Sequence, residues 1–131
     1  MIRVAFVLEA HNWLGGVSYY RNLFSALNLL SPKQLQPIVF LGTDVPEEIA
    51  ANYRDVELVR TALLNPNRPY GLARRAIRKL ACQRDVLLTE LLTRHSIQAL
   101  SHFPGRILKT SRIKTISWIP DFQHIHLPDF F

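Results

Sequence analysis

Three short segments of the sequence carry residues that a simple connection between secondary-structure elements does not need. Each follows an apolar run, and the three are Glu9 to Gly16, Ser101 to Gly105, and the segment from Pro120 onward. In an open α/β sheet, ligands bind beyond the carboxyl ends of the strands. The sequence therefore predicts ligand-binding or catalytic residues in these three segments.

The first segment reads EAHNWLGG and ends in two adjacent glycines, Gly15 and Gly16. Glycine has no Cβ, so the backbone can approach a ligand closely. A helix that opens here would present free N–H groups and partial positive charge, which suit a phosphate. The alternative is a tight turn that uses glycine for positive φ. Neither GxGxxG nor a Walker loop is present, so the pair of glycines alone does not decide between a phosphate-binding helix start and a turn.

The last segment reads DFQHIHLPDFF and contains two histidines, His124 and His126, two residues apart. On a strand this spacing places both side chains on one face, which would suit a metal. No cysteine lies nearby, and only Asp121 and Asp129 could add ligands. We therefore expect no metal site. We expect His126 to be a packed loop residue, and the simplest role for Asp121 is to cap or turn the loop.

A long helix is predicted from Tyr70 to about His95, because apolar residues recur there at helical spacing. Basic residues occupy the opposing arc, namely Arg74, Arg75, Arg78 and Lys79. A solvated helix face is the usual meaning of such an arc, and docking on anionic lipid headgroups is the functional alternative. Aromatic residues are not interleaved with these cations, so nucleic-acid binding is not expected.

Length and composition favour one folded, basic domain. The chain has 131 residues, 48% of them hydrophobic, and a net charge of +6. Such a domain attracts polyanions, including anionic lipid and phosphorylated small molecules. No apolar run approaches the roughly 20 residues of a membrane helix. The single Cys82 excludes an internal disulfide, which fits the cytoplasm.

Strands and helices are expected to alternate. Short runs of buried, often β-branched residues predict five strands, at Ile2 to Leu8, Ile38 to Leu41, Val56 to Val59, Ile97 to Leu100 and Lys114 to Trp118. Between them, an amphipathic helix is predicted from Val17 to Leu30 and a shorter one after Pro46. This alternation predicts an α/β, Rossmann-like three-layer domain with a mainly parallel sheet.

Read together, the motifs MIRVAFVLEAHNWLGGVSYYRNL, PIVFLG and SWIPDFQHIHLPDFF resemble the amino-terminal half of retaining GT-B glycosyltransferases of the family 4, or group 1, type. The resemblance depends on a GG loop after the first strand, a PDFQH loop after a later strand, and PDFF just beyond it. It spans nearly the whole chain, although residues 43–95 carry little motif information.

The resemblance implies two Rossmann-like domains that face a cleft, an acceptor-side amino-terminal one and a donor-binding carboxyl-terminal one. It implies that Gly15 and Gly16 approach the donor phosphates and that His124 contacts the transferred sugar. It also gives three further candidate substrate-binding residues, which are Asn12, Asp121 and Gln123. No metal or cofactor is implied beyond the nucleotide-sugar co-substrate.

Against that family, residues 1–131 correspond to an incomplete amino-terminal domain, and the donor-binding domain is absent. We therefore expect little or no transferase activity from these residues alone. A glycan or lipid-linked acceptor is expected, with a cytoplasmic location that includes peripheral contact with the inner membrane. The alternative function is a non-catalytic α/β module that binds anionic lipid or a phosphorylated ligand.

Overall fold

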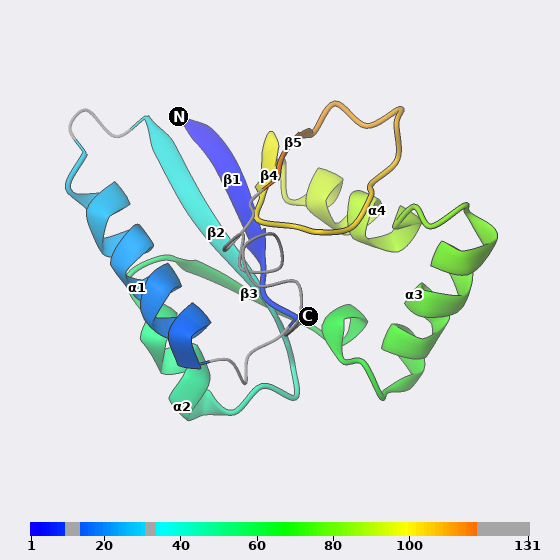
Figure 1. Ribbon diagram of the computed structural model, residues 1–131, viewed down its shortest axis with the longest axis horizontal. Coiled ribbons are helices and arrows are strands. Elements are labelled where there is room, and N and C mark those ends of the chain that lie inside the picture. The colour runs from blue at the N-terminus through cyan, green and yellow to red at the C-terminus, as the bar shows by residue number, and fades with distance from the viewer. Residues whose placement is uncertain (10–13, 31–33, 118–131) are drawn as a thin grey trace, which may run out of the picture.

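A five-stranded, all-parallel sheet forms the centre of the computed structural model, which describes residues 1–9, 14–30 and 34–117 (Figure 1). The strands are β1 (Ile2–Val7), β2 (Leu35–Gly42), β3 (Glu57–Thr61), β4 (Ala99–Ser101) and β5 (Lys114–Ile116). Their order across the sheet is β3-β2-β1-β4-β5. The expected α/β class and parallel sheet are confirmed.

Helices cover both faces of the sheet. They are α1 (Leu14–Asn28), α2 (Glu47–Ala50), α3 (Pro69–Leu80) and α4 (Val86–Arg94), with single 3₁₀ turns η1 (Ala51–Tyr53) and η2 (Ala62–Leu64). Figure 1 shows α1 and α2 on one side of the sheet and α3 and α4 on the other. The domain therefore has three layers. Within the described ranges, no helix combines the length and apolarity needed to cross a membrane.

Successive side chains along each strand point to opposite faces of the sheet, so the core has two parts, one on each face. In β1 and the residue after it, Val4, Phe6 and Leu8 face one helical layer, whereas Ala5 and Val7 face the other. The first core contains Phe24 and Tyr53 from α1 and η1, and the second contains Leu88 and Leu92 from α4. A strand buried on both faces explains why the N-terminal run is almost continuously apolar.

The strand positions agree with the sequence prediction to within a few residues. β2 begins earlier than expected, at Leu35, and β5 is described as far as Ile116. The first helix also begins earlier, at Leu14 rather than Val17. Gly15 and Gly16 consequently lie in the first turn of α1.

The prediction of one long helix from Tyr70 to His95 is wrong. The chain leaves the helical path after Leu80, where Cys82 and Gln83 adopt left-handed backbone conformations with φ of 51° and 64°. A second helix, α4, then starts under the cap of Asp85, whose side chain accepts a hydrogen bond from the backbone N–H of Leu88. The apolar periodicity continues across this break, which is why the pattern alone joins the two helices.

Candidate functional site

The sheet reverses its winding direction at β1. The chain adds β2 and β3 on one side of β1 and then crosses to add β4 and β5 on the other. Phe6 pairs with Ser101, so both strands end at the same edge and their following segments leave side by side. Such a switch point is where open α/β sheets bind ligands. It brings Glu9 beside the segment Ser101 to Gly105, so described residues from two of the three predicted segments lie together.

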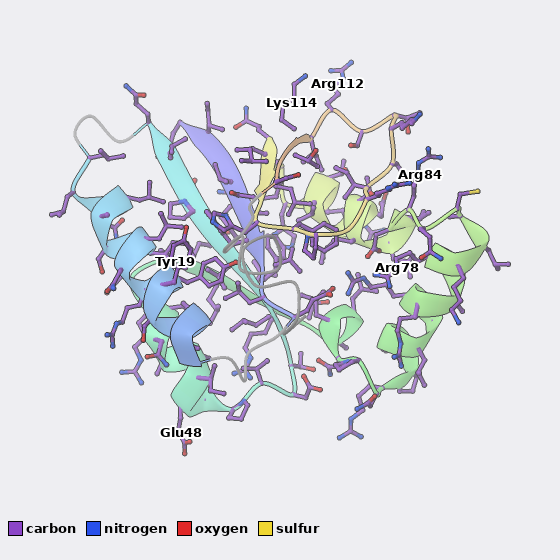
Figure 2. The ribbon with its side chains drawn as sticks, in the orientation of Figure 1. Tyr19, Glu48, Arg78, Arg84, Arg112 and Lys114 are labelled. Atoms are coloured by element: carbon purple, nitrogen blue, oxygen red, sulfur yellow. The ribbon has the colours of Figure 1, made fainter. Side chains whose placement is uncertain are left out.

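A first polar group at this edge, here called the histidine cluster, consists of Ser101, His102 and Tyr19. The Nδ1 atom of His102 lies 2.7 Å from the Ser101 Oγ, and its Nε2 atom lies 3.0 Å from the Tyr19 Oη. Tyr19 comes from the second turn of α1 (Figure 2). The backbone N–H of His102 donates to the carbonyl of Ile116, at 3.0 Å. The imidazole is thus fixed by hydrogen bonds at both ring nitrogens.

Aromatic rings surround this imidazole. The ring centroids of Phe6, Tyr19 and Tyr20 lie 5.5, 5.7 and 5.6 Å from that of His102. Burial lowers the pKa of His102, which favours its neutral form. Burial, together with the neighbouring Tyr19 and Tyr53, raises the pKa of Tyr20 to about 12. The imidazole of His102 is therefore neutral near neutral pH.

The backbone of His102 is also unusual. Its φ of 61° lies in the left-handed region, which non-glycine residues seldom occupy. Residues held in such conformations concentrate at binding and catalytic sites. Together with its place directly after β4, this conformation marks His102 as a candidate ligand-contacting residue.

A second polar group, here called the arginine cluster, consists of Glu9, Arg74 and Asp85. The Nε and Nη2 atoms of Arg74 lie 2.8 and 2.6 Å from the Asp85 Oδ2, and Nη2 lies 2.5 Å from the Glu9 Oε1. Arg74 is 8% exposed and Asp85 is 1% exposed. Burial alone would lower the pKa of Arg74, but its hydrogen bond with Asp85 and the charge of Glu9 outweigh burial and raise it. The guanidinium therefore stays charged inside the fold.

Asp85 connects this cluster to the segment that follows β4. One carboxylate oxygen binds Arg74, and the other accepts the Leu88 N–H at 3.1 Å and so caps α4. The Asp85 backbone N–H donates to the carbonyl of Arg106, at 2.7 Å. Two helices and the segment after β4 are thereby held at this one residue.

The expectation that Arg74 faces a membrane is wrong, because the residue is buried in the arginine cluster. Sequence periodicity placed it on an outward arc, but two distant carboxylates draw it inward. Arg75 and Lys79 are exposed, whereas Arg78 is half-buried. Figure 2 shows Arg78 and Arg84 on the side of the molecule formed by α3 and α4, away from Tyr19.

A hollow lies between the α3–α4 turn and the segment after β4. It is lined by Glu9, Arg78, Gln83, Phe103, Pro104, Gly105 and Arg106. Two guanidiniums beside a carboxylate can bind a phosphate, which the cations would hold. They can also bind sugar hydroxyls, which would accept hydrogen bonds from the guanidiniums and donate to the carboxylate. Glu9 also borders a second hollow, against η2 and the first turns of α3.

The helix-opening interpretation of Gly15 and Gly16 agrees with the structure. Both lie in α1, and no glycine within the described ranges has positive φ. The alternative of a turn that requires glycine for its φ is therefore wrong. Gly16 is buried at the start of this helix, in the segment that follows β1.

Several predicted site residues lie outside the described residues, namely Asn12, Asp121, Gln123 and His124. Conversely, His102, Tyr19 and Glu9 are not among the site residues predicted from the sequence. A histidine directly after a predicted strand was the feature that could have identified His102. In the part of the chain that the structure describes, no group of three or more His, Cys, Asp or Glu residues gathers as a metal site would require.

Comparisons with known proteins give no identity for this chain, since no family model, curated protein or solved structure matches it. The strand order and the polar groups at the switch point are consequently the structural features that bear on function.

Proposed function

We propose that this chain is the acceptor-side, amino-terminal domain of a retaining GT-B glycosyltransferase that uses a nucleotide-sugar donor. The observation that carries the proposal is the strand order β3-β2-β1-β4-β5, because it ends β1 and β4 at the same edge, where Tyr19 of α1 meets His102 after β4. The motif resemblance supplies the reaction class, and the switch point supplies a place for the ligand.

Transfer would break the bond between the anomeric carbon and the donor phosphate and form one to an acceptor oxygen. The acceptor hydroxyl loses its proton to the departing nucleoside diphosphate. Negative charge grows on that leaving group, and the free N–H groups in the first turn of α1 suit its stabilisation. His124 is the sequence-based candidate for contact with the transferred sugar.

The described residues favour a polar acceptor. Glu9 can accept hydrogen bonds from sugar hydroxyls, and Arg78 and Arg106 can donate to them across the same hollow. The imidazole of His102 lies at the end of the neighbouring strand. Carbohydrate recognition needs this mixture of donors and acceptors on a rigid framework.

The test is transfer by the protein expressed from its full reading frame. It is incubated with a panel of nucleotide sugars and with glycan and lipid-linked acceptors, and the product's anomeric configuration is read by NMR. We expect transfer with retention, and a decrease of about a hundredfold or more in kcat for His124→Ala at unchanged thermal stability. Gly15→Val should lower turnover, whereas Ser18→Val, one turn later on the exposed side of α1, should not.

Absence of transfer across the whole panel would overturn the proposal, as would inversion at the anomeric carbon. In that case the non-catalytic module for anionic or phosphorylated ligands becomes the better function. Binding of inorganic phosphate or nucleoside diphosphates without turnover, followed by NMR at His102, would support that module.

A further inference from the structure

The helix α3 turns two arginines toward the protein and leaves most of its apolar side chains exposed, with only Ile77 among them half-buried. Gly71 and Arg74 are buried and Arg78 is half-buried, and their spacing of three and four residues places them on one face. The opposite face carries Leu72, and exposed apolar residues continue along it. They are Tyr70, Leu72, Ala73, Ala76 and Leu80. Water-exposed helices of globular proteins show the reverse arrangement.

Two contacts fix this orientation. A Cβ at position 71 would lie 1.8 Å from the carbonyl oxygen of Asn65, so only glycine allows α3 to approach η2 this closely. One turn later, Arg74 enters the arginine cluster. Rotating α3 to hide its leucines would remove the Arg74 ion pairs and separate Gly71 from its neighbour.

The exposure of the apolar face is large. The exposed fractions are 86% for Leu80, 67% for Tyr70 and 50% for Leu72. Leu72, Ala76 and Leu80 follow one another at intervals of four residues and form one stripe along α3. Figure 1 shows α3 at the right-hand edge of the molecule.

A row of cations borders this stripe. Arg75 and Lys79 are both exposed and lie four residues apart on the side adjoining the leucines. Arg75 donates one hydrogen bond to the carbonyl of Pro66, at 2.7 Å, and Arg68 precedes the helix. The sequence of α3 contains no acidic residue, and the chain carries a net charge of +6. The surface is thus apolar at its centre and positive at its border.

We propose that α3 docks this protein on an anionic lipid bilayer, with Leu72, Ala76 and Leu80 entering the interface and Arg75 and Lys79 lying against the lipid headgroups. Amphipathic helices with basic borders bind membranes in this way. Charge complementarity favours lipid, since a headgroup layer offers negative charge along the whole border of the stripe. Tyr70 adds an aromatic ring with a polar end, which suits the same interface.

The docking differs from the one that the sequence predicted. There the cations at positions 74, 75, 78 and 79 formed the contact, whereas here an apolar stripe enters the lipid and only Arg75 and Lys79 assist. The docking does not depend on the proposed transferase activity. It is tested without nucleotide sugar, so that either proposal can fail alone.

The experiment is co-sedimentation of the 131-residue chain with vesicles of phosphatidylcholine alone or with about one-third phosphatidylglycerol. We expect binding to the anionic vesicles and little to the neutral ones. Leu80→Asp should weaken binding by about tenfold or more, because it removes an apolar side chain from the interface. Lys79→Glu should weaken it about fivefold or more and remove the preference for anionic lipid.

The matched control is Leu29→Asp, since Leu29 directly follows α1 and is 85% exposed, and α1 lies on the opposite side of the sheet from α3. It should bind vesicles like the unaltered chain, and far-UV circular dichroism should show both leucine variants folded. Equal loss in the two variants, or no vesicle binding by the unaltered chain, would overturn the proposal. A dimer in sedimentation velocity that Leu80→Asp disrupts, without vesicle binding, would overturn it in favour of a second copy.

Discussion

The arginine cluster and the histidine cluster lie at the same edge of the sheet, yet they hold their polar groups in opposite ways. In the arginine cluster, a buried guanidinium is balanced by two carboxylates, and one of these also caps a helix. In the histidine cluster, neutral groups share hydrogen bonds inside a shell of aromatic rings. Full charges resist separation strongly, whereas neutral hydrogen bonds exchange readily with those of a ligand.

Because of this difference, we expect the two clusters to have different roles. The arginine cluster connects α3, α4 and the segment after β1, so it maintains the fold. The histidine cluster ends β4 in a left-handed conformation and presents polar atoms from two elements, so it is the better candidate for ligand contact. Four experiments test this division, in order of decreasing predicted change.

Replacing Asp85 should disturb the fold more than any other change considered. Asp85→Ala leaves Arg74 with only Glu9 and removes the cap of α4, so we expect a loss of about 3–5 kcal/mol in the free energy of unfolding. Urea denaturation followed by circular dichroism measures this. Glu90→Ala is the matched control, because it breaks an exposed pair with Arg94 and should change stability by less than about 0.5 kcal/mol. Similar losses in both variants would contradict a structural role for the cluster.

Adding a methyl group at position 71 tests whether α3 must approach η2 closely. Gly71→Ala places a Cβ against a backbone carbonyl, which should destabilise the protein by about 1–3 kcal/mol. Gly105→Ala is the comparison, since its Cβ would meet the ring of the Phe103 side chain rather than a backbone atom. Thermal melts should show the larger shift for Gly71→Ala, and the reverse order would contradict this account.

Removing the phenol of Tyr19 tests the neutral cluster directly. Tyr19→Phe deletes the hydrogen bond to the Nε2 of His102, and we expect a loss of about 0.5–1.5 kcal/mol in urea denaturation. The imidazole resonances of His102 should also move in NMR spectra. Tyr70→Phe, on the exposed face of α3, should leave both quantities unchanged, and an equal effect there would argue against the pair.

The smallest effect should come from the pH dependence of His102. Burial lowers its folded-state pKa below the ordinary 6.5, so the unfolded chain takes up a proton first as the pH falls. The contribution of His102 to stability is full above pH 6.5 and decreases as the pH falls from there through the folded-state pKa. His102→Asn, which tolerates the left-handed backbone, should lose this component of the pH dependence. Identical urea midpoints against pH for both proteins would contradict the assignment.

The sequence predicted the sheet well because each strand is defined by local composition. Buried strands of a parallel sheet are short apolar runs, and the segments at their carboxyl ends could be located without knowing any contact. The placement of Gly15 and Gly16 at a helix start followed from the same reasoning. Among the strands, only the ends shifted, for instance at Leu35.

The errors concern α3, where the decisive partners of Arg74 lie outside the helix. Periodicity placed Arg74 outside and Leu80 inside, as for an ordinary amphipathic helix. Glu9 and Asp85 reverse this orientation, and their approach to Arg74 depends on the fold as a whole. The break after Leu80 was equally hidden, since Cys82 and Gln83 adopt left-handed conformations without glycine or proline to indicate them. Asp85 followed by an apolar run was the local sign of a new helix start.

The central position of β1 also affects how this protein is made. Of the five described strands, β1 leaves the ribosome before the others and can pair with β2 once residue 42 is free, but its other edge is unpaired until Ala99–Ser101 appear. Pairing over such separations is slow, and an open apolar strand edge invites association with other chains. Nascent chains that stop before residue 101 should therefore aggregate or recruit chaperones, whereas slightly longer ones should resist proteases.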